Sequence, residues 1–258
     1  MLSPDQRRQL QELGYLTLPG AIAPALRARV LDTLEALYAQ EGERAGSEFK
    51  QEPGARRLAN LVDKDPLFAE CIAQPLLLEC VAAVVGPRYK LSSLNARSAN
   101  PHNGLDQPLH ADGGALPDEQ GAWVCNTLWM LDDVSAENGA LRVIPRSHRA
   151  GKLPADALAD PTAPHPDQQL LTARAGDVLV LDAHLWHGGL ANRTSAPRTA
   201  LHAFYCRRDK PQQQYQKALV RPEVQAQLSP QLRHLLALDD AENDQISSQP
   251  TRRSGFLK

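Results

Sequence analysis

The stretch Gln107-Pro108-Leu109-His110-Ala111-Asp112-Gly113-Gly114 carries the strongest indication of fold and function in this sequence. His110 and Asp112 stand two residues apart, so on an extended backbone their side chains point to the same side. An imidazole and a carboxylate that converge with one further imidazole form the 2-His-1-carboxylate triad of non-haem Fe(II) oxygenases. The short motif alone is weak, because any polar turn can contain it, and a third ligand farther along the chain is required.

A candidate for this third ligand lies in the segment 176–189. Gly176 and Asp177 predict a turn, residues 178–181 predict an apolar strand, and His184 and His187 follow before a Gly-Gly break. Both histidines are candidates for the ligand. Arg198 then precedes another strand-like segment, and an arginine holds a carboxylate in a bidentate pair better than a lysine does. The combined pattern indicates a metal site beside a carboxylate-binding arginine.

The residue pattern from Tyr89 onward predicts a mostly β core with flanking helices. Short strand-like segments are separated by clusters of Gly, Pro, Asn and Asp. They cover residues 89–99, 122–131, 141–144, 169–173, 177–181 and 199–206. Many short strands with such joints are typical of a double-sheet jelly roll, as in cupins.

The first third of the chain is predicted to be helical, with helices over residues 3–13 and 24–40 and two shorter helices within 65–85. Residues 41–57 predict a loop. With 258 residues, the chain fits a single domain. We expect a helical N-terminal part over about 1–87, a jelly-roll core over about 88–206 and a helical C-terminal tail over 207–258.

Composition excludes several classes of protein. Lys plus Arg is 28 and Asp plus Glu is 30, a net charge of −2, so a dedicated nucleic-acid binder is not expected. No apolar run is long enough to span a membrane, and the N-terminus has no apolar signal core. The four cysteines form no CxxC pair, which favours core thiols in a reduced, cytoplasmic protein.

Several motifs in order resemble the phytanoyl-CoA dioxygenase family of Fe(II)/2-oxoglutarate-dependent oxygenases. The opening from Leu2-Ser3-Pro4 to Leu18-Pro19-Gly20 is similar to that family's usual start. Further similarity lies in His110-Ala111-Asp112, in the segment from Asp132 to Ser147-His148, and from Gly176 to Arg198. The resemblance covers roughly residues 3–206.

This resemblance implies a double-stranded β-helix in which His110, Asp112 and His187 bind Fe(II), while Arg198 holds the C5 carboxylate of 2-oxoglutarate. It favours His187 over His184, because the spacing from His187 to Arg198 fits the family. Two positions depart from the family. Arg146 stands where the family often has glycine, and Gly189 stands where it often has a small hydroxyl residue.

Further candidates are expected around the same centre. Gln107 and Thr127 are predicted to contact the carboxylates of 2-oxoglutarate, as is Asn95 from a strand that lines the barrel. Arg97, on the same strand face as Asn95, and Arg146 are candidates for contact with an anionic substrate. The lid is expected in the loop 113–121, in the loop 152–167 or in both.

The resulting functional hypothesis is a dioxygenase that uses Fe(II), 2-oxoglutarate and O2 to hydroxylate a small molecule, with release of succinate and CO2. The metal centre is the catalytic group, and no separate acid or base is assigned. The same oxidative chemistry also serves desaturation, ring closure or epimerisation. An alternative from another class is a non-catalytic, cupin-like protein that binds a metal or ligand.

Overall fold

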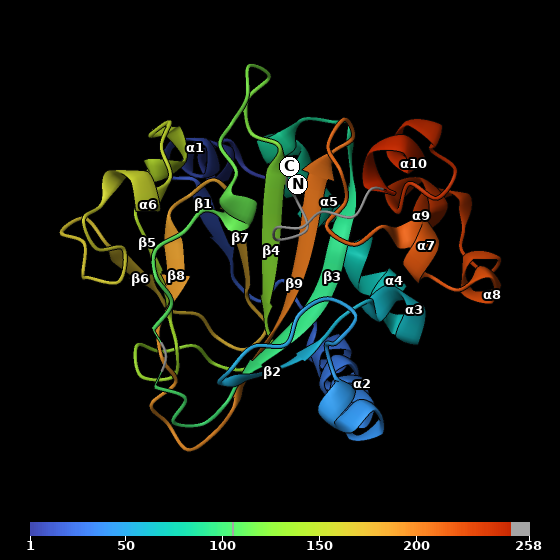
Figure 1. The fold of residues 1–258 in the computed structure, drawn as a ribbon, viewed down its shortest axis with the longest axis horizontal. Helices are drawn as coiled ribbons and strands as arrows, with labels where there is room; N and C mark the ends of the chain where they lie inside the picture. The colour runs from blue at the N-terminus through green and yellow to red at the C-terminus, as the bar shows by residue number, and fades with distance from the viewer. Residues whose placement is uncertain (105, 249–258) are drawn as a thin grey trace.

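Two antiparallel sheets face each other and form the centre of the fold (Figure 1). The computed structural model describes residues 1–104 and 106–248. The larger sheet has six strands in the order β1-β7-β4-β9-β3-β2, and the smaller has three in the order β6-β5-β8. The strands are β1 (Tyr15–Leu18), β2 (Ala55–Leu58), β3 (Tyr89–Ala99), β4 (Val124–Met130), β5 (Leu141–Val143), β6 (Gln169–Leu171), β7 (Val178–Asp182), β8 (His187–Gly189) and β9 (Arg198–Arg207).

Helices flank the larger sheet, and the C-terminal helices lie beside β3 (Figure 1). The α-helices are α1 (Pro4–Leu13), α2 (Pro24–Glu41), α3 (Leu61–Lys64), α4 (Leu67–Ile72), α5 (Pro75–Val85), α6 (Pro154–Ala157), α7 (Gln216–Leu219), α8 (Pro222–Gln225), α9 (Pro230–Leu235) and α10 (Ala241–Ser247). Short 3-10 turns are η1 (Gly42–Arg44), η2 (Asp112–Gly114) and η3 (Ser147–Arg149). Within the described residues, none of the helices is long and apolar enough to cross a membrane.

The alternation of side chains along the central strands separates two layers of the core. On β4, Cys125 and Trp129 pack against the helices, whereas Leu128 and Met130 face the smaller sheet. Strand β7 follows the same rule, with Val180 toward the helices and Leu179 toward the smaller sheet. This period of two decides which side chains reach the space between the sheets.

The N-terminal helix begins and ends where its capping residues predict. Ser3 forms a capping box with Gln6, and Pro4 occupies the first turn. Gly14 closes the helix with a φ of +84°, in the left-handed region. A Cβ atom there would lie 2.5 Å from His148 Nδ1, so glycine also allows the chain to pass close to His148 on its way into β1.

The structure contains elements that the sequence pattern did not indicate. Strand β2 begins within the predicted loop 41–57 and ends at Leu58, and its sequence Ala55-Arg56-Arg57-Leu58 shows no clear alternation. The C-terminal part, predicted as a helical tail, holds four short helices within the described residues, α7, α8, α9 and α10. All four cysteines are buried free thiols, as predicted.

A buried lysine anchors the C-terminal helices to the larger sheet. Lys90 on β3 has no exposed surface, and its Nζ donates to Arg208 O at 2.8 Å and to Asn243 Oδ1 at 2.7 Å. Burial lowers the pKa of Lys90. Because an ammonium group without partners is costly to bury, Asn243 on α10 holds the tail against β3.

We predict that Asn243→Leu lowers the free energy of unfolding by about 2–3 kcal/mol, because Lys90 loses one of its two acceptors. Urea unfolding followed by circular dichroism measures this change. Gln245→Ala, an exposed substitution on the same helix, serves as the control and is expected to have little effect. Equal stability of the Asn243 variant and the parent protein would contradict this role.

Candidate metal centre and its cavity

The segment before η2 and strand β8 meet through a single antiparallel bridge between two histidines. His110 N donates to His187 O and His187 N donates to His110 O, each at 2.9 Å. Asp112 opens η2, and its backbone N–H donates to Ala183 O at 2.9 Å. One ligand atom from each of His110, Asp112 and His187 lies within 4.8 Å of the others. The structure thus brings the three predicted ligands together.

The imidazoles are oriented by matching hydrogen bonds to the backbone. His110 Nδ1 lies 2.9 Å from Pro108 O, and His187 Nδ1 lies 2.8 Å from Leu185 O. A carbonyl accepts only, so each Nδ1 carries the proton, and each Nε2 offers its lone pair. The two Nε2 atoms lie 3.8 Å and 3.5 Å from Asp112 Oδ1. This donor set fits a divalent metal ion of the kind bound by two histidines and one carboxylate.

The ionisation of the three side chains also suits a metal. Burial, helped by the neighbouring His187, lowers the pKa of His110 to about 4. Burial acts to raise the pKa of Asp112, but His187 and His110 outweigh it and bring the value to about 2. For His187, Asp112 outweighs the effect of burial and raises the pKa. At neutral pH the site therefore offers an ionised carboxylate and at least one neutral imidazole, as metal binding requires.

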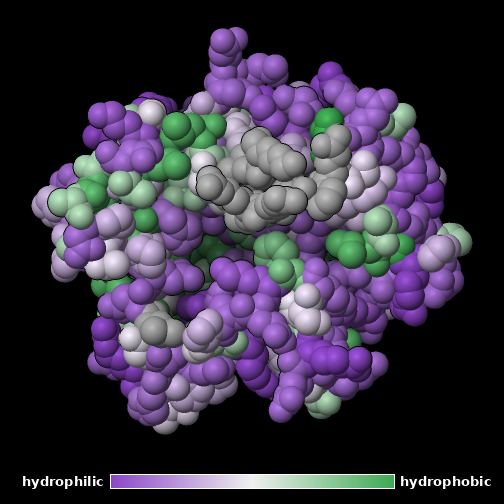
Figure 2. All heavy atoms as spheres, viewed as in Figure 1, coloured by the Kyte–Doolittle hydropathy of each residue, from purple (hydrophilic) through white to green (hydrophobic). Residues whose placement is uncertain are grey.

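The three side chains line a cavity of about 970 Å³. Leu128, Met130 and Leu179 form an apolar wall on the larger sheet, and Leu141 and Gly189 belong to the smaller sheet. Figure 2 shows a hollow near the centre of this face, with apolar groups inside and a polar rim. A cavity of this size accommodates a small-molecule ligand together with a co-substrate.

Arg198, at the start of β9, points into this cavity. Its Nη2 donates to Gly139 O at 3.0 Å, and no carboxylate of the described residues forms an ion pair with it. Burial lowers the pKa of Arg198 to about 10, with a contribution from Arg97, so the guanidinium stays charged at neutral pH. Gly139 has a φ of +101°, and a Cβ atom there would lie 3.1 Å from Arg198 Nη2. Glycine at this turn leaves room for the arginine.

Two of the predicted co-substrate residues, Gln107 and Asn95, also line the cavity. Gln107 Oε1 accepts from Gly189 N at 2.9 Å, which packs its carboxamide against β8. Asn95 Oδ1 accepts from Gln214 Nε2 at 3.0 Å. Their binding of 2-oxoglutarate stays a prediction.

The structure corrects the predictions that Thr127 contacts the co-substrate and that Arg146 contacts the substrate, and it refines the prediction for Arg97. Thr127 lies on β4 between Cys125 and Trp129, on the face toward the helices, so it cannot contact a molecule in the cavity. Arg146 is exposed and lies outside the cavity lining, and its φ of +71° explains why glycine suits this position. Arg97 does line the cavity, but Glu52 already forms an ion pair with it.

Several polar residues of the cavity were not predicted, among them Asn126 and His202. Asn126 Nδ2 lies 3.5 Å from Asp112 Oδ2. His202 lies on β9, and burial together with Arg57, Arg97 and Arg198 lowers its pKa to about 3. Alternation along the strand could have predicted that His202 lines the cavity, because His202 stands four residues after Arg198 and therefore faces the same side.

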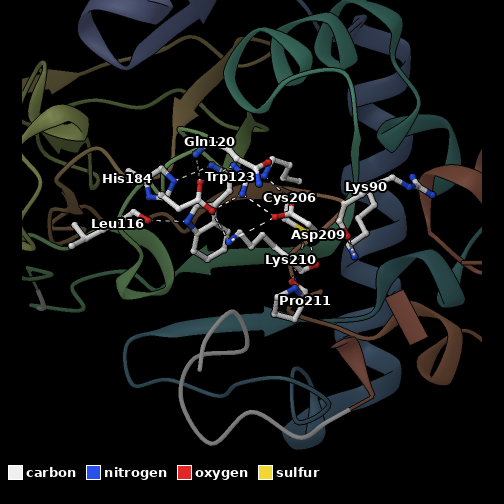
Figure 3. Close-up of polar contacts among 12 residues, drawn as sticks. Lys90, Leu116, Gln120, Trp123, His184, Cys206, Asp209, Lys210 and Pro211 are labelled. Atoms are coloured by element: carbon white, nitrogen blue, oxygen red, sulfur yellow. Dashed lines mark hydrogen bonds and ion pairs between the residues drawn. The ribbon is translucent and has the colours of Figure 1, made fainter. Parts of the chain in front are cut away.

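His184, the alternative ligand, turns away from the metal centre and holds the loop that follows Asp112. Its Nε2 accepts from Trp123 N at 3.1 Å, and its Nδ1 lies 3.0 Å from Ala115 O. Figure 3 shows His184 beside Trp123, close to Leu116, whose carbonyl accepts from Trp123 Nε1 at 2.8 Å. The prediction of His187 over His184 as the third ligand agrees with this placement.

The predicted lid loops contribute little to the cavity. The hairpin 113–121 is tied to the end of β9, because Asp118 accepts from Arg207 Nη1 at 3.0 Å and pairs with Lys210 at 2.6 Å. Within the described residues, only Gly113 of the two loops lines the cavity. Segments 48–50 and 213–219 provide the outer wall instead.

Together, the fold and the site define a double-stranded β-helix with a 2-His-1-carboxylate centre. The family model for phytanoyl-CoA dioxygenase (PhyH) matches residues 10–200. The chain therefore belongs to the phytanoyl-CoA dioxygenase family, and the predicted enzyme class, a dioxygenase, is confirmed.

Individual relatives and solved structures agree. Dioxygenase af480 of Aspergillus fumigatus is 28% identical over 243 residues, which cover 91% of this chain and 76% of the relative. HygX from Streptomyces hygroscopicus, solved with nickel and 2-oxoglutarate bound, superposes with a TM-score of 0.62 at 20% identity, over 80% of this chain and 87% of HygX. The carbocyclase SnoK from nogalamycin biosynthesis gives a TM-score of 0.66 at 19% identity, over 81% of this chain and 85% of SnoK. These likenesses confirm the predicted fold class.

We predict that His184→Leu weakens Co(II) binding by about tenfold, because Ala115 and Trp123 lose the side chain that fixes the loop after Asp112. The visible absorption of bound Co(II) measures this affinity. His234→Leu, which replaces an exposed histidine on α9, is the control. Unchanged Co(II) affinity in the His184 variant would show that the loop keeps its place without this side chain.

Proposed function

We propose that this chain is an Fe(II)- and 2-oxoglutarate-dependent dioxygenase that hydroxylates a small molecule, with release of succinate and CO2. The observation that carries this proposal is the placement of the His110, Asp112 and His187 ligand atoms in one cavity with Arg198. HygX, which shares the fold, was crystallised with nickel and 2-oxoglutarate, and this supports the same pair of cofactors here.

Each residue of the site has a defined task in this proposal. His110, Asp112 and His187 would hold the iron, which when bound supplies the activation of O2 and the oxidation of a substrate C–H bond. Arg198 would neutralise the distal carboxylate of 2-oxoglutarate, because its guanidinium is buried and has no ion-pair partner in the described chain. The apolar wall around Leu128, Met130 and Leu179 keeps water from the reacting groups.

The arginine favours an enzyme over a non-catalytic cupin-like binding protein. Burying a guanidinium without a counter-ion is costly, and a metal-binding protein has no need of it. A second candidate within the enzyme class is ring closure, because SnoK is described as a carbocyclase and shares the fold. Desaturation and epimerisation would use the same site. The four buried thiols favour a reducing compartment such as the cytoplasm.

Succinate formation from 2-oxoglutarate tests this proposal. We predict that the purified protein, supplied with Fe(II), ascorbate and air, forms succinate slowly even without substrate. His110→Ala and Asp112→Ala each should abolish this activity, because each removes one metal ligand, while the circular dichroism spectrum stays unchanged. Full succinate formation by either variant would contradict the ligand assignment. If the parent protein forms none, anaerobic binding of Fe(II) and 2-oxoglutarate, followed by its visible charge-transfer band, tests the two cofactors directly, and absence of the band would contradict the proposal.

A separate prediction concerns the co-substrate. Arg198→Ala should raise the KM for 2-oxoglutarate by at least about tenfold, because a charge-assisted hydrogen bond to a carboxylate is lost. Arg146→Ala, in which an exposed arginine outside the cavity is removed, should leave this KM unchanged. The dependence of succinate formation on 2-oxoglutarate concentration measures both values. An unchanged KM in the Arg198 variant would exclude that arginine from the role.

A further inference from the structure

Three cations surround a single carboxylate in the outer wall of the cavity. Glu52 forms ion pairs with Arg57 at 2.9 Å, with Arg97 and with Lys50 at 3.6 Å. Lys50, Arg57 and Arg97 line the same cavity as the metal ligands. We refer to Lys50, Arg57, Arg97 and Glu52 as the cation cluster.

The pairing of β2 with β3 places the two arginines directly opposite each other. Arg57 on β2 is the register partner of Arg97 on β3. Like charges at opposite positions repel, so a carboxylate between them is required. Figure 1 shows β2 and the loop before it in front of the lower ends of β3 and β9. The cluster thus lies where the loop before β2 covers the larger sheet, which also carries Arg198.

One carboxylate does not balance this cluster. The side chains of Arg57, Arg97 and Glu52 are 14%, 13% and 10% exposed, so water screens them only in part. Of the acidic groups that line the cavity, Asp112 belongs to the metal centre, and Glu48 shares Lys64 with Glu41, at 2.8 Å and 2.6 Å. The cluster itself therefore has three cations for one carboxylate, a net charge of +2.

Arg57 also has an unused donor. Its Nε is buried and has no hydrogen-bond partner in the part of the chain that the structure describes. A buried donor without a partner is rare in folded proteins and points to a ligand that supplies the acceptor. The register partner of Arg198 is Ala99 on β3, and Arg97 stands two residues before Ala99. Arg97 therefore lies on the same face of the sheet as Arg198.

The three cations of the cluster face the same cavity as the metal centre. Lys50, Arg57 and Arg97 line it together with His110 and His202. These groups therefore lie close to the space between the metal centre and the outer wall. An anion in that space would be attracted by all three cations.

We propose that the cation cluster binds an anionic group of the substrate, a carboxylate or a phosphate, and so determines that this enzyme acts on an anionic small molecule. This inference rests on the proposed function, because it assumes that the metal centre oxidises what the cluster holds. Arg57 and Arg97 are the specificity-determining residues, and Lys50, at 58% exposure, guides the anion inward. Glu52 competes with the bound anion for the same guanidinium groups.

The alternative is that the cluster only fastens the loop 45–54 to β3. The two interpretations differ in the sign of one effect. If the cluster only fastens the loop, removal of Glu52 or of either arginine weakens the same structure. If the cluster binds an anion, removal of the arginines weakens anion binding, whereas removal of the Glu52 charge strengthens it.

The test uses the full chain saturated with Ni(II) and 2-oxoglutarate, with inorganic phosphate and acetate as probes in isothermal titration calorimetry. We expect one probe or both to bind with a Kd on the order of millimolar, and the stronger one identifies the class of anion. Arg57→Gln and Arg97→Gln should weaken this binding by about tenfold, because each loses a charge-assisted hydrogen bond. Glu52→Gln should tighten it.

Arg56→Gln is the matched control. Arg56 precedes Arg57 on β2, but its side chain points away from the cavity. It pairs with Glu35 at 2.7 Å and lies 4.2 Å from the ring centre of Tyr38. Its replacement should leave anion binding unchanged. Absence of binding to the parent protein would overturn the proposal, as would equal binding by the Arg57 and Arg97 variants or weaker binding by the Glu52 variant.

Binding of 2-oxoglutarate, followed by the charge-transfer band of the anaerobic Fe(II) protein, separates this proposal from the function on which it rests. We expect the Arg57 and Arg97 variants to bind 2-oxoglutarate like the parent. A matching loss of 2-oxoglutarate affinity would assign the cluster to the co-substrate and overturn the proposal. If the parent protein binds no 2-oxoglutarate, the proposed function fails, and the same calorimetric titration without 2-oxoglutarate still decides whether the cluster binds an anion.

Discussion

The bridge between His110 and His187 is the interaction on which the site depends. Its two hydrogen bonds of 2.9 Å join a segment outside the sheets to the short strand β8. Each histidine then donates its Nδ1 proton to the carbonyl two residues before it, Pro108 or Leu185. The backbone thus sets the tautomer and the direction of both rings, and no second side chain is needed to orient them. Asp112 is held by neighbours instead: Ala183, the Asn126 side chain and the loop held by His184.

The charged side chains that line the cavity are mostly positive. Arg198, Lys50, Arg57 and Arg97 place positive charge around a space that Asp112 and Glu48 also line, while Glu52 pairs with the last three of these cations. Burial, and after it the charge of Arg97, lowers the pKa of Arg198, so part of this lowering reflects repulsion between the two cations. The proposed dianionic co-substrate and anionic substrate would both reduce that repulsion. In the proposed function, binding of these anions would therefore also relieve the repulsion among the cations of the cavity.

Local spacing explains why some of the site was predictable. His110 and Asp112 are close in sequence, and Arg198 begins a strand, so short-range patterns located them. Thr127 was wrong because the phase of alternation along β4 is set by packing against the helices, which sequence spacing does not reveal. Strand β2 escaped prediction because the ion pairs of Glu52 hold it against β3, and those contacts form only in the folded chain.

Gln107 and Gly189 form one unit, which accounts for a departure from the family pattern. Gln107 N donates to Gly189 O at 2.8 Å, and Gly189 N donates to Gln107 Oε1 at 2.9 Å. A Cβ atom at position 189 would lie 3.0 Å from that same oxygen, closer than an ordinary contact. A hydroxyl residue at 189 therefore requires the carboxamide to move. In this chain the polar group beside β8 comes from Gln107, so replacing Gly189 by serine would displace a cavity side chain before it could add a new hydrogen bond.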